Sequence, residues 1–153
     1  MHKPLLIQYF LHILLACSLQ IHFPLLHAQE ISVRPIPMLD KLPVKAIHRI
    51  FQDSEGYIWY GTFDGLCRYD GYDIKVYRSD LSNPNLLASN YITYIAEDHE
   101  KKIWFGTTNG LYTLDKSTQQ IKTIPLEGSQ DPNVFSINVT RDGTIWALSL
   151  IHI

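Results

Sequence analysis

The sequence predicts an all-β fold, a partial β-propeller of four-stranded antiparallel blades with two full blades and part of a third. The phrase IWYGTFDGL at residues 58–66 returns as IWFGTTNGL at residues 103–111, an offset of 45 positions. Within each copy, short runs of aromatic and branched residues alternate with Asp-Gly or Asn-Gly turns. Repeats of ~40–50 residues with four strands each are typical of propeller blades, which pack radially around an axis.

Blade 1 is expected at residues 44–78 and blade 2 at residues 91–126, with a linker rich in Ser, Asn and Pro at 79–90. The strands predicted for blade 1 are Val44–Gln52, Ile58–Phe63, Leu66–Tyr69 and Ile74–Tyr77. Those predicted for blade 2 are Ile92–Glu97, Ile103–Thr107, Leu111–Leu114 and Ile121–Ile124. No helical spacing persists for three turns in these segments, so strands are favoured throughout.

An incomplete blade 3 is expected at residues 134–153. Its predicted strands are Val134–Val139 and Ile145–Trp146. The tripeptide Ala147-Leu148-Ser149 follows its tryptophan, where the first two copies have an aromatic residue and then Gly-Thr. We therefore expect this unit to lack its last two strands.

The repeated tryptophans and glycines have physical roles in such a stack of sheets. Trp59 and Trp104 are expected between adjacent blades, where a large aromatic ring buries ~150–250 Å². Gly61 and Gly106 lie inside strands, where glycine is unfavourable unless another backbone passes close by. The packing of one blade on the next supplies that reason.

The first 28 residues are expected to be a cleaved secretory signal peptide. A lysine near the N-terminus is followed by the apolar run Leu5–Ala16 and by Ala28, a small residue at the expected cleavage point. A lipid-modified Cys17 and an uncleaved membrane anchor are the alternatives, although polar residues and Pro24 interrupt the ~20 apolar residues that an anchor needs. Residues 29–43 would then form an N-terminal segment with a candidate closing strand at Ile31–Pro37.

Charge and cysteine content narrow the classes of function. Removal of Lys3 with the signal leaves 12 basic and 15 acidic side chains, a net charge of −3. No basic patch remains to hold nucleic acid or an anionic membrane. Cys67 would be the one cysteine left, so the mature chain folds without an internal disulfide.

The stretch FQDSEGYIWYGTFDGLCRYDGYDIKVY, residues 51–77, resembles the two-component regulator propeller repeat. The resemblance covers about residues 31–147 and points to the N-terminal periplasmic sensor part of a Bacteroides-type hybrid two-component system. It implies a much longer parent protein, anchored in the inner membrane and dimeric, in which further blades, a β domain, a membrane helix and a histidine kinase follow. Some of these parents also carry a response regulator with a DNA-binding module.

The same resemblance implies a periplasmic module that senses a ligand, most plausibly an oligosaccharide, without catalysis or a cofactor. The sequence has no kinase motif of its own. A secreted propeller enzyme, a lyase or hydrolase, and a binding scaffold are the alternatives, since fold alone does not settle function. A ring needs ~4–8 blades, so we expect the chain alone not to perform the sensing.

The aromatic residues could form a sugar-stacking platform or a packed interior. Their recurrence at fixed repeat positions favours packing, because a ligand site seldom needs the same residue in every blade. The residues concerned are Tyr57, Trp59, Tyr60, Trp104 and Phe105. No ligand-binding residue is therefore assigned.

No residue is assigned to catalysis, to a cofactor or to a metal. Asp53 and Asp98 are expected to set turns through hydrogen bonds from side chain to backbone, rather than to act as acids or bases. His48 and His99 have no second ligand at a metal-binding spacing. Cys67 is expected to be a half-buried strand thiol.

Overall fold

The computed structural model describes residues 12, 32–33, 35, 39–79, 87–126 and 132–149. Nearly all of the predicted signal peptide lies outside these residues, as do Cys17, most of the candidate strand at 31–37 and the centre of the 79–90 linker. The chain divides into a unit at residues 1–35 and a unit at residues 36–153, and all of the sheets belong to the second. Among the described residues, no helix is long and apolar enough to span a membrane.

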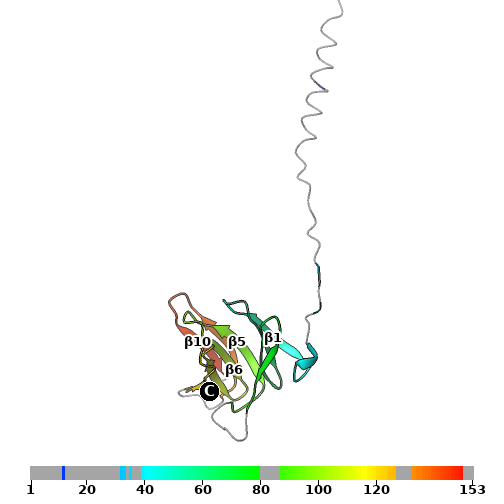
Figure 1. Ribbon diagram of the computed structural model, residues 1–153. Coiled ribbons are helices and arrows are strands. Elements are labelled where there is room, and N and C mark those ends of the chain that lie inside the picture. The colour runs from blue at the N-terminus through cyan, green and yellow to red at the C-terminus, as the bar shows by residue number, and fades with distance from the viewer. Residues whose placement is uncertain are drawn as a thin grey trace, which may run out of the picture. The chain divides into compact units, whose positions relative to one another are not determined.

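Three antiparallel sheets follow one another in chain order within the described residues (Figure 1). The first contains β1 (Ile47–Gln52), β2 (Ile58–Thr62), β3 (Gly65–Tyr69) and β4 (Ile74–Tyr77). The second contains β5 (Ile92–Glu97), β6 (Ile103–Thr107), β7 (Gly110–Leu114) and β8 (Ile121–Ile124), and the third β9 (Val134–Val139) and β10 (Ile145–Ser149). A 3-10 turn at Leu39–Lys41 precedes β1. The predicted fold class, a partial propeller of four-stranded blades, is confirmed.

The third sheet extends further than the sequence predicts. β10 continues to Ser149 instead of ending near Trp146, because its backbone pairs with β9 as far as Val134. Loss of the Gly-Thr pair therefore does not end the strand. A strand needs a backbone partner more than it needs a particular side chain.

All three sheets share one irregularity near the start of the first strand. The pairing register shifts between Ile47 and Arg49 in β1 and between Ile92 and Tyr94 in β5, which leaves one bulged residue in each strand. The β9–β10 pair shifts at the matching place, opposite Leu148 and Ser149. A bulge re-aims a side chain, and these equivalent bulges show that the sequence repeat is also a structural repeat.

Each seam between neighbouring sheets is an apolar core. In the first seam, Trp59, Leu66 and Tyr77 of the first sheet belong to one buried cluster with residues of the second sheet, namely Ile92, Ile95, Ile103, Phe105, Tyr112 and Leu114. In the second seam, Leu111 packs with Val134 and Ile137 of β9. The first strands of adjacent sheets contact each other, β1 with β5 and β5 with β9, as in radial packing.

Gly61 and Gly106 lie where the next sheet comes closest. A Cβ atom on Gly61 would lie 3.2 Å from Cγ2 of Ile92, and one on Gly106 would lie 2.7 Å from Cγ1 of Val134. The next sheet does pack closely on both glycines, as predicted, but its closest atoms belong to the side chains of Ile92 and Val134 and not to its backbone. In the third sheet the equivalent residue is Leu148, whose side chain is 63% exposed.

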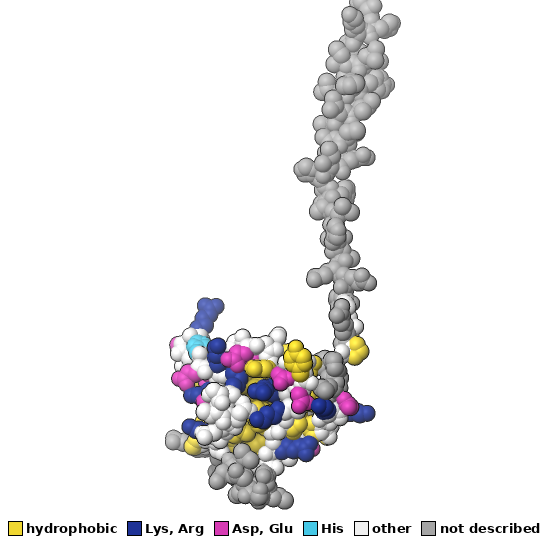
Figure 2. All heavy atoms as spheres, viewed as in Figure 1, with side chains coloured by type: hydrophobic (Ala, Val, Ile, Leu, Met, Phe, Trp, Pro, Cys, Tyr) yellow, Lys and Arg dark blue, Asp and Glu magenta, His cyan; other side chains and the backbone are white. Residues whose placement is uncertain are grey.

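The opposite face of the first sheet carries a separate cluster of Leu42, Tyr60, Cys67 and Ile74. The prediction of a half-buried thiol is wrong, because Cys67 is fully buried in this cluster. Burial raises the pKa of its thiol to about 12, which makes it unreactive at neutral pH. On the visible face of the sheets, acidic and basic side chains are interspersed rather than gathered by sign (Figure 2).

Candidate functional site

Asp53 and Asp98 each lock a tryptophan to the turn that precedes it. Asp53 accepts hydrogen bonds from two backbone N–H groups of the β1–β2 turn, and its Oδ2 accepts one from Nε1 of Trp59 at 2.8 Å. Asp98 does the same in the second sheet, with Nε1 of Trp104 at 2.6 Å. The predicted turn bonds are confirmed. The indole bond was missed, although the constant spacing of six residues between aspartate and tryptophan in both copies could have indicated it.

A buried lysine of the second sheet also binds Asp53, across the first seam. Lys116, in the β7–β8 turn, places Nζ 2.7 Å from Oε1 of Glu97, 3.2 Å from Oδ2 of Asp53 and 3.2 Å from Oε2 of Glu55. The lysine side chain is 8% exposed. We call Lys116 and these three carboxylates the lysine latch.

The latch favours the charged forms of Asp53 and Lys116. Burial pushes the pKa of Asp53 upward, but the bonds from Trp59 and Lys116 outweigh it and leave that pKa below its ordinary value. Burial likewise lowers the pKa of Lys116, but the neighbouring carboxylates raise it above its ordinary value. Acid–base catalysis needs shifts toward the working pH, so the latch is built for cohesion between sheets.

Acid is expected to weaken the first seam through Asp53. Because the folded-state pKa of Asp53 lies below its unfolded value, its contribution to stability is present above the unfolded pKa of about 3.9 and is lost as the pH falls through the folded pKa. Urea unfolding at a series of pH values should show the free energy of unfolding dropping below about pH 4. The Asp53→Asn variant should be less stable at neutral pH with a shallower acid dependence. Parallel profiles for the two proteins would contradict this.

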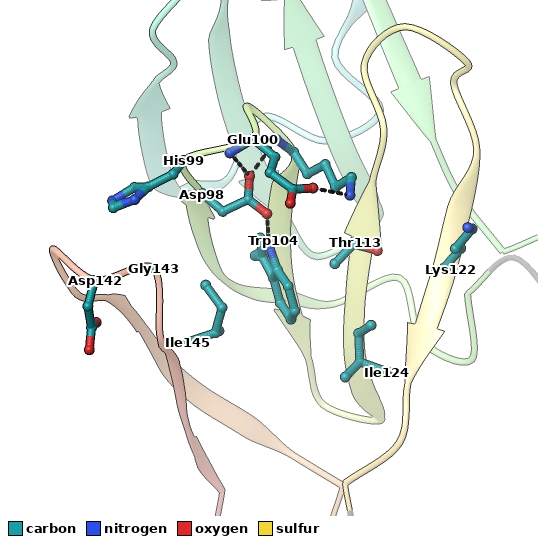
Figure 3. Close-up of a pocket in the computed structure, with 11 residues that line it drawn as sticks. Asp98, His99, Glu100, Trp104, Thr113, Lys122, Ile124, Asp142, Gly143 and Ile145 are labelled. Atoms are coloured by element: carbon teal, nitrogen blue, oxygen red, sulfur yellow. Dashed lines mark hydrogen bonds and ion pairs between the residues drawn. The ribbon is translucent and has the colours of Figure 1, made fainter.

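An open groove of about 610 Å³ lies between the second and third sheets. Figure 3 shows the Trp104 ring between Ile124 and Ile145, with its nitrogen toward Asp98. Charged residues of both signs complete the lining: Glu100, Asp142, Lys102 and Lys122. A flat ring beside carboxylates and amines could hold a polar ligand. We call this space the Trp104 groove.

The counterpart of the Trp104 groove is filled by polypeptide. Trp59 is fully buried and stacks on Tyr77, with 6.0 Å between ring centroids. The β7–β8 turn covers both rings: Lys116 binds Asp53, and the Tyr77 hydroxyl donates to Oε1 of Gln119 at 2.5 Å. The described part of the third sheet has no such turn. The groove therefore has the shape of a seat for a β-turn rather than of a ligand pocket.

The remaining candidates from the sequence do not come together as a site. Tyr60 and Phe105 are buried in packing clusters, and Tyr57 carries the guanidinium of Arg68 over its ring, 4.7 Å from the centroid. His99 lines the Trp104 groove, whereas His48 lies in the first seam. Across the described residues, no group of three or more His, Cys, Asp or Glu side chains is placed to hold a metal ion.

Comparison with known families identifies the repeat. Residues 41–64 and 86–109 match the family described as two component regulator propeller. Two segments of the chain, one in each of the first two sheets, are therefore similar to this propeller repeat. No curated protein sequence matches the chain.

Several solved structures are similar to most of this chain. One is the extracellular domain of a protein described as a hybrid two component system of B. thetaiotaomicron, with a TM-score of 0.61, 19% identity and 78% of this chain covered. Another, from a one component system of the same organism, has a TM-score of 0.58, 26% identity and 76% coverage. Virginiamycin B lyase from Staphylococcus aureus has a TM-score of 0.54, 18% identity and 70% coverage. This chain spans 17% of each of the two extracellular domains and 36% of the lyase chain.

Proposed function

We propose that this chain contributes the first blades of a periplasmic propeller that senses an oligosaccharide for a two-component system. The observation that carries the proposal is the pair of regulator propeller repeats, each built as a complete four-stranded sheet. The similarity in fold to the extracellular domains of a hybrid two component system and of a one component system supports the same reading. In this proposal residues 1–28 direct export and are removed, and the parent protein is dimeric and anchored in the inner membrane. The kinase and the remaining blades belong to that parent.

A secreted propeller lyase is the second candidate, because one structural neighbour is a lyase. At 18% identity that likeness concerns the fold alone. In the lysine latch one amine is bound by three carboxylates, and the Trp104 groove has the shape of a seat for a β-turn. Neither arrangement favours catalysis over binding.

Binding of oligosaccharides by the purified exported protein tests the proposal. We expect sensing itself to need a closed ring of blades, but saturation-transfer NMR with cellohexaose, xylohexaose and mannohexaose should still show weak saturable binding of at least one of them to the surface that these blades contribute. Absence of binding by all three would contradict the proposed function. Shorter or unsaturated products in the same samples would instead support the lyase or hydrolase alternative.

A further inference from the structure

Three aromatic rings meet at one end of the first seam, where the β2–β3 turn and the start of β5 lie. They belong to His48 of β1, Phe63 of the β2–β3 turn and Tyr91, which precedes β5. The ring centroids are 4.7 Å apart for His48 and Phe63, 4.9 Å for His48 and Tyr91, and 4.6 Å for Phe63 and Tyr91. Phe63 is 51% exposed and Tyr91 is 37% exposed. We call these three residues the aromatic rim.

Packing of the sheets does not require these rings. His48 is the bulged residue of β1, and its Nε2 donates to the carbonyl oxygen of Ile92, which ties the first sheet to the second. In the second seam the bulged residue is Thr93, whose hydroxyl donates to the carbonyl oxygen of Val134. A threonine thus makes the same tie. The second-seam residues equivalent to His48, Phe63 and Tyr91 are Thr93, Thr108 and Asn133.

Exposed polar groups adjoin the aromatic rim in the chain. Asp64, next to Phe63, lies 3.2 Å from a guanidinium nitrogen of Arg78 and accepts a hydrogen bond from Nδ2 of Asn90 at 3.3 Å. The side chains of Arg78 and Asp64 are 46% and 37% exposed. Because these two charges pair with each other, the surface offers hydrogen-bonding groups without a strong excess of either sign.

We infer that the aromatic rim is a contact surface for a neutral oligosaccharide. Sugar rings have apolar C–H faces that pack on exposed aromatic rings, and their hydroxyls need nearby donors and acceptors, which Asp64, Asn90 and Arg78 supply. A balanced pair of charges favours a neutral sugar over an anionic one. The inference rests on the proposed function and gives it a place in the fold.

A variant that copies the second seam tests the site. The substitutions His48→Thr, Phe63→Thr and Tyr91→Asn install residues that already serve at equivalent positions, so the fold should be retained. We expect the Kd for the most tightly bound of the three oligosaccharides, measured by NMR titration, to rise about tenfold or more. Phe63→Thr alone should raise the Kd several-fold. Tyr72→Thr is the matched control, because Tyr72 is an aromatic residue 86% exposed in the β3–β4 turn, and its Kd should equal that of the unmodified protein.

The outcomes separate the site from the function. Unchanged affinity for that oligosaccharide in both the triple variant and Phe63→Thr would overturn the aromatic rim as the site and leave the proposed function standing. Tighter binding of trigalacturonic acid than of all three neutral oligosaccharides would overturn the neutral class of ligand. Failure of the unmodified protein to bind any of the oligosaccharides would contradict the function, and the site with it.

Discussion

Replacement of Trp59 by alanine is expected to lower the free energy of unfolding by about 3–5 kcal/mol. Trp59 is fully buried in the first seam, stacks on Tyr77 and donates to Asp53. The substitution removes the largest side chain of that seam and leaves a buried carboxylate without one of its donors. Urea unfolding followed by circular dichroism measures the change.

The third tryptophan is the control for this prediction. Trp146 occupies the same repeat position but is 65% exposed, and Thr140 stands where the other two copies have aspartate. Trp146→Ala should therefore change stability by no more than about 0.5 kcal/mol. Equal losses for the two substitutions would show that the loss in free energy of unfolding depends on the repeat position and not on burial. That result would contradict our assignment of the seams.

Replacement of Lys116 by alanine is expected to destabilise the protein by about 3–5 kcal/mol, because it leaves the carboxylates of Asp53 and Glu97 buried without a counter-charge. Lys102→Ala is the matched control. Its amine pairs with Glu100 at 2.5 Å on the surface, at 41% exposure, where such pairs contribute about 0–1 kcal/mol. Thermal and urea unfolding of both variants give the comparison.

A double substitution shows whether the Lys116 loss comes from the latch. In Lys116→Ala with Asp53→Asn, the second change removes one unpaired carboxylate, so the combined loss should be smaller than the sum of the two single losses. Simple additivity would mean that Lys116 and Asp53 act independently. That result would contradict an electrostatic latch across the seam.

The sequence predicts the strands well because the repeat aligns the same turn and strand residues twice. β4, β5, β6, β8 and β9 have the predicted bounds. The roles of Gly61 and Gly106 also followed from the pattern, since glycine inside a strand needs a close neighbour. Such predictions succeed where one local rule decides the structure.

Contacts between the sheets could not be predicted from the sequence. Lys116 lies 63 residues from Asp53, and no local pattern places its amine beside three carboxylates. The aromatic rim was missed for a different reason. The residues that repeat in both copies mark the packing positions, whereas His48, Phe63 and Tyr91 stand at positions where the copies differ. A comparison of the copies for exposed aromatic differences could have found them.

A chemical-shift map of the protein titrated with the most tightly bound of the three oligosaccharides tests the assignment of the ligand surface most directly. We expect the backbone amide shifts to change around residues 47–49, 62–65 and 89–92, which surround the aromatic rim, and to stay unchanged at Asp98, Trp104 and Ile124. Changes concentrated at Asp98, Trp104 and Ile124 instead would show that the Trp104 groove is the ligand site, and would contradict its interpretation as the seat of a β-turn.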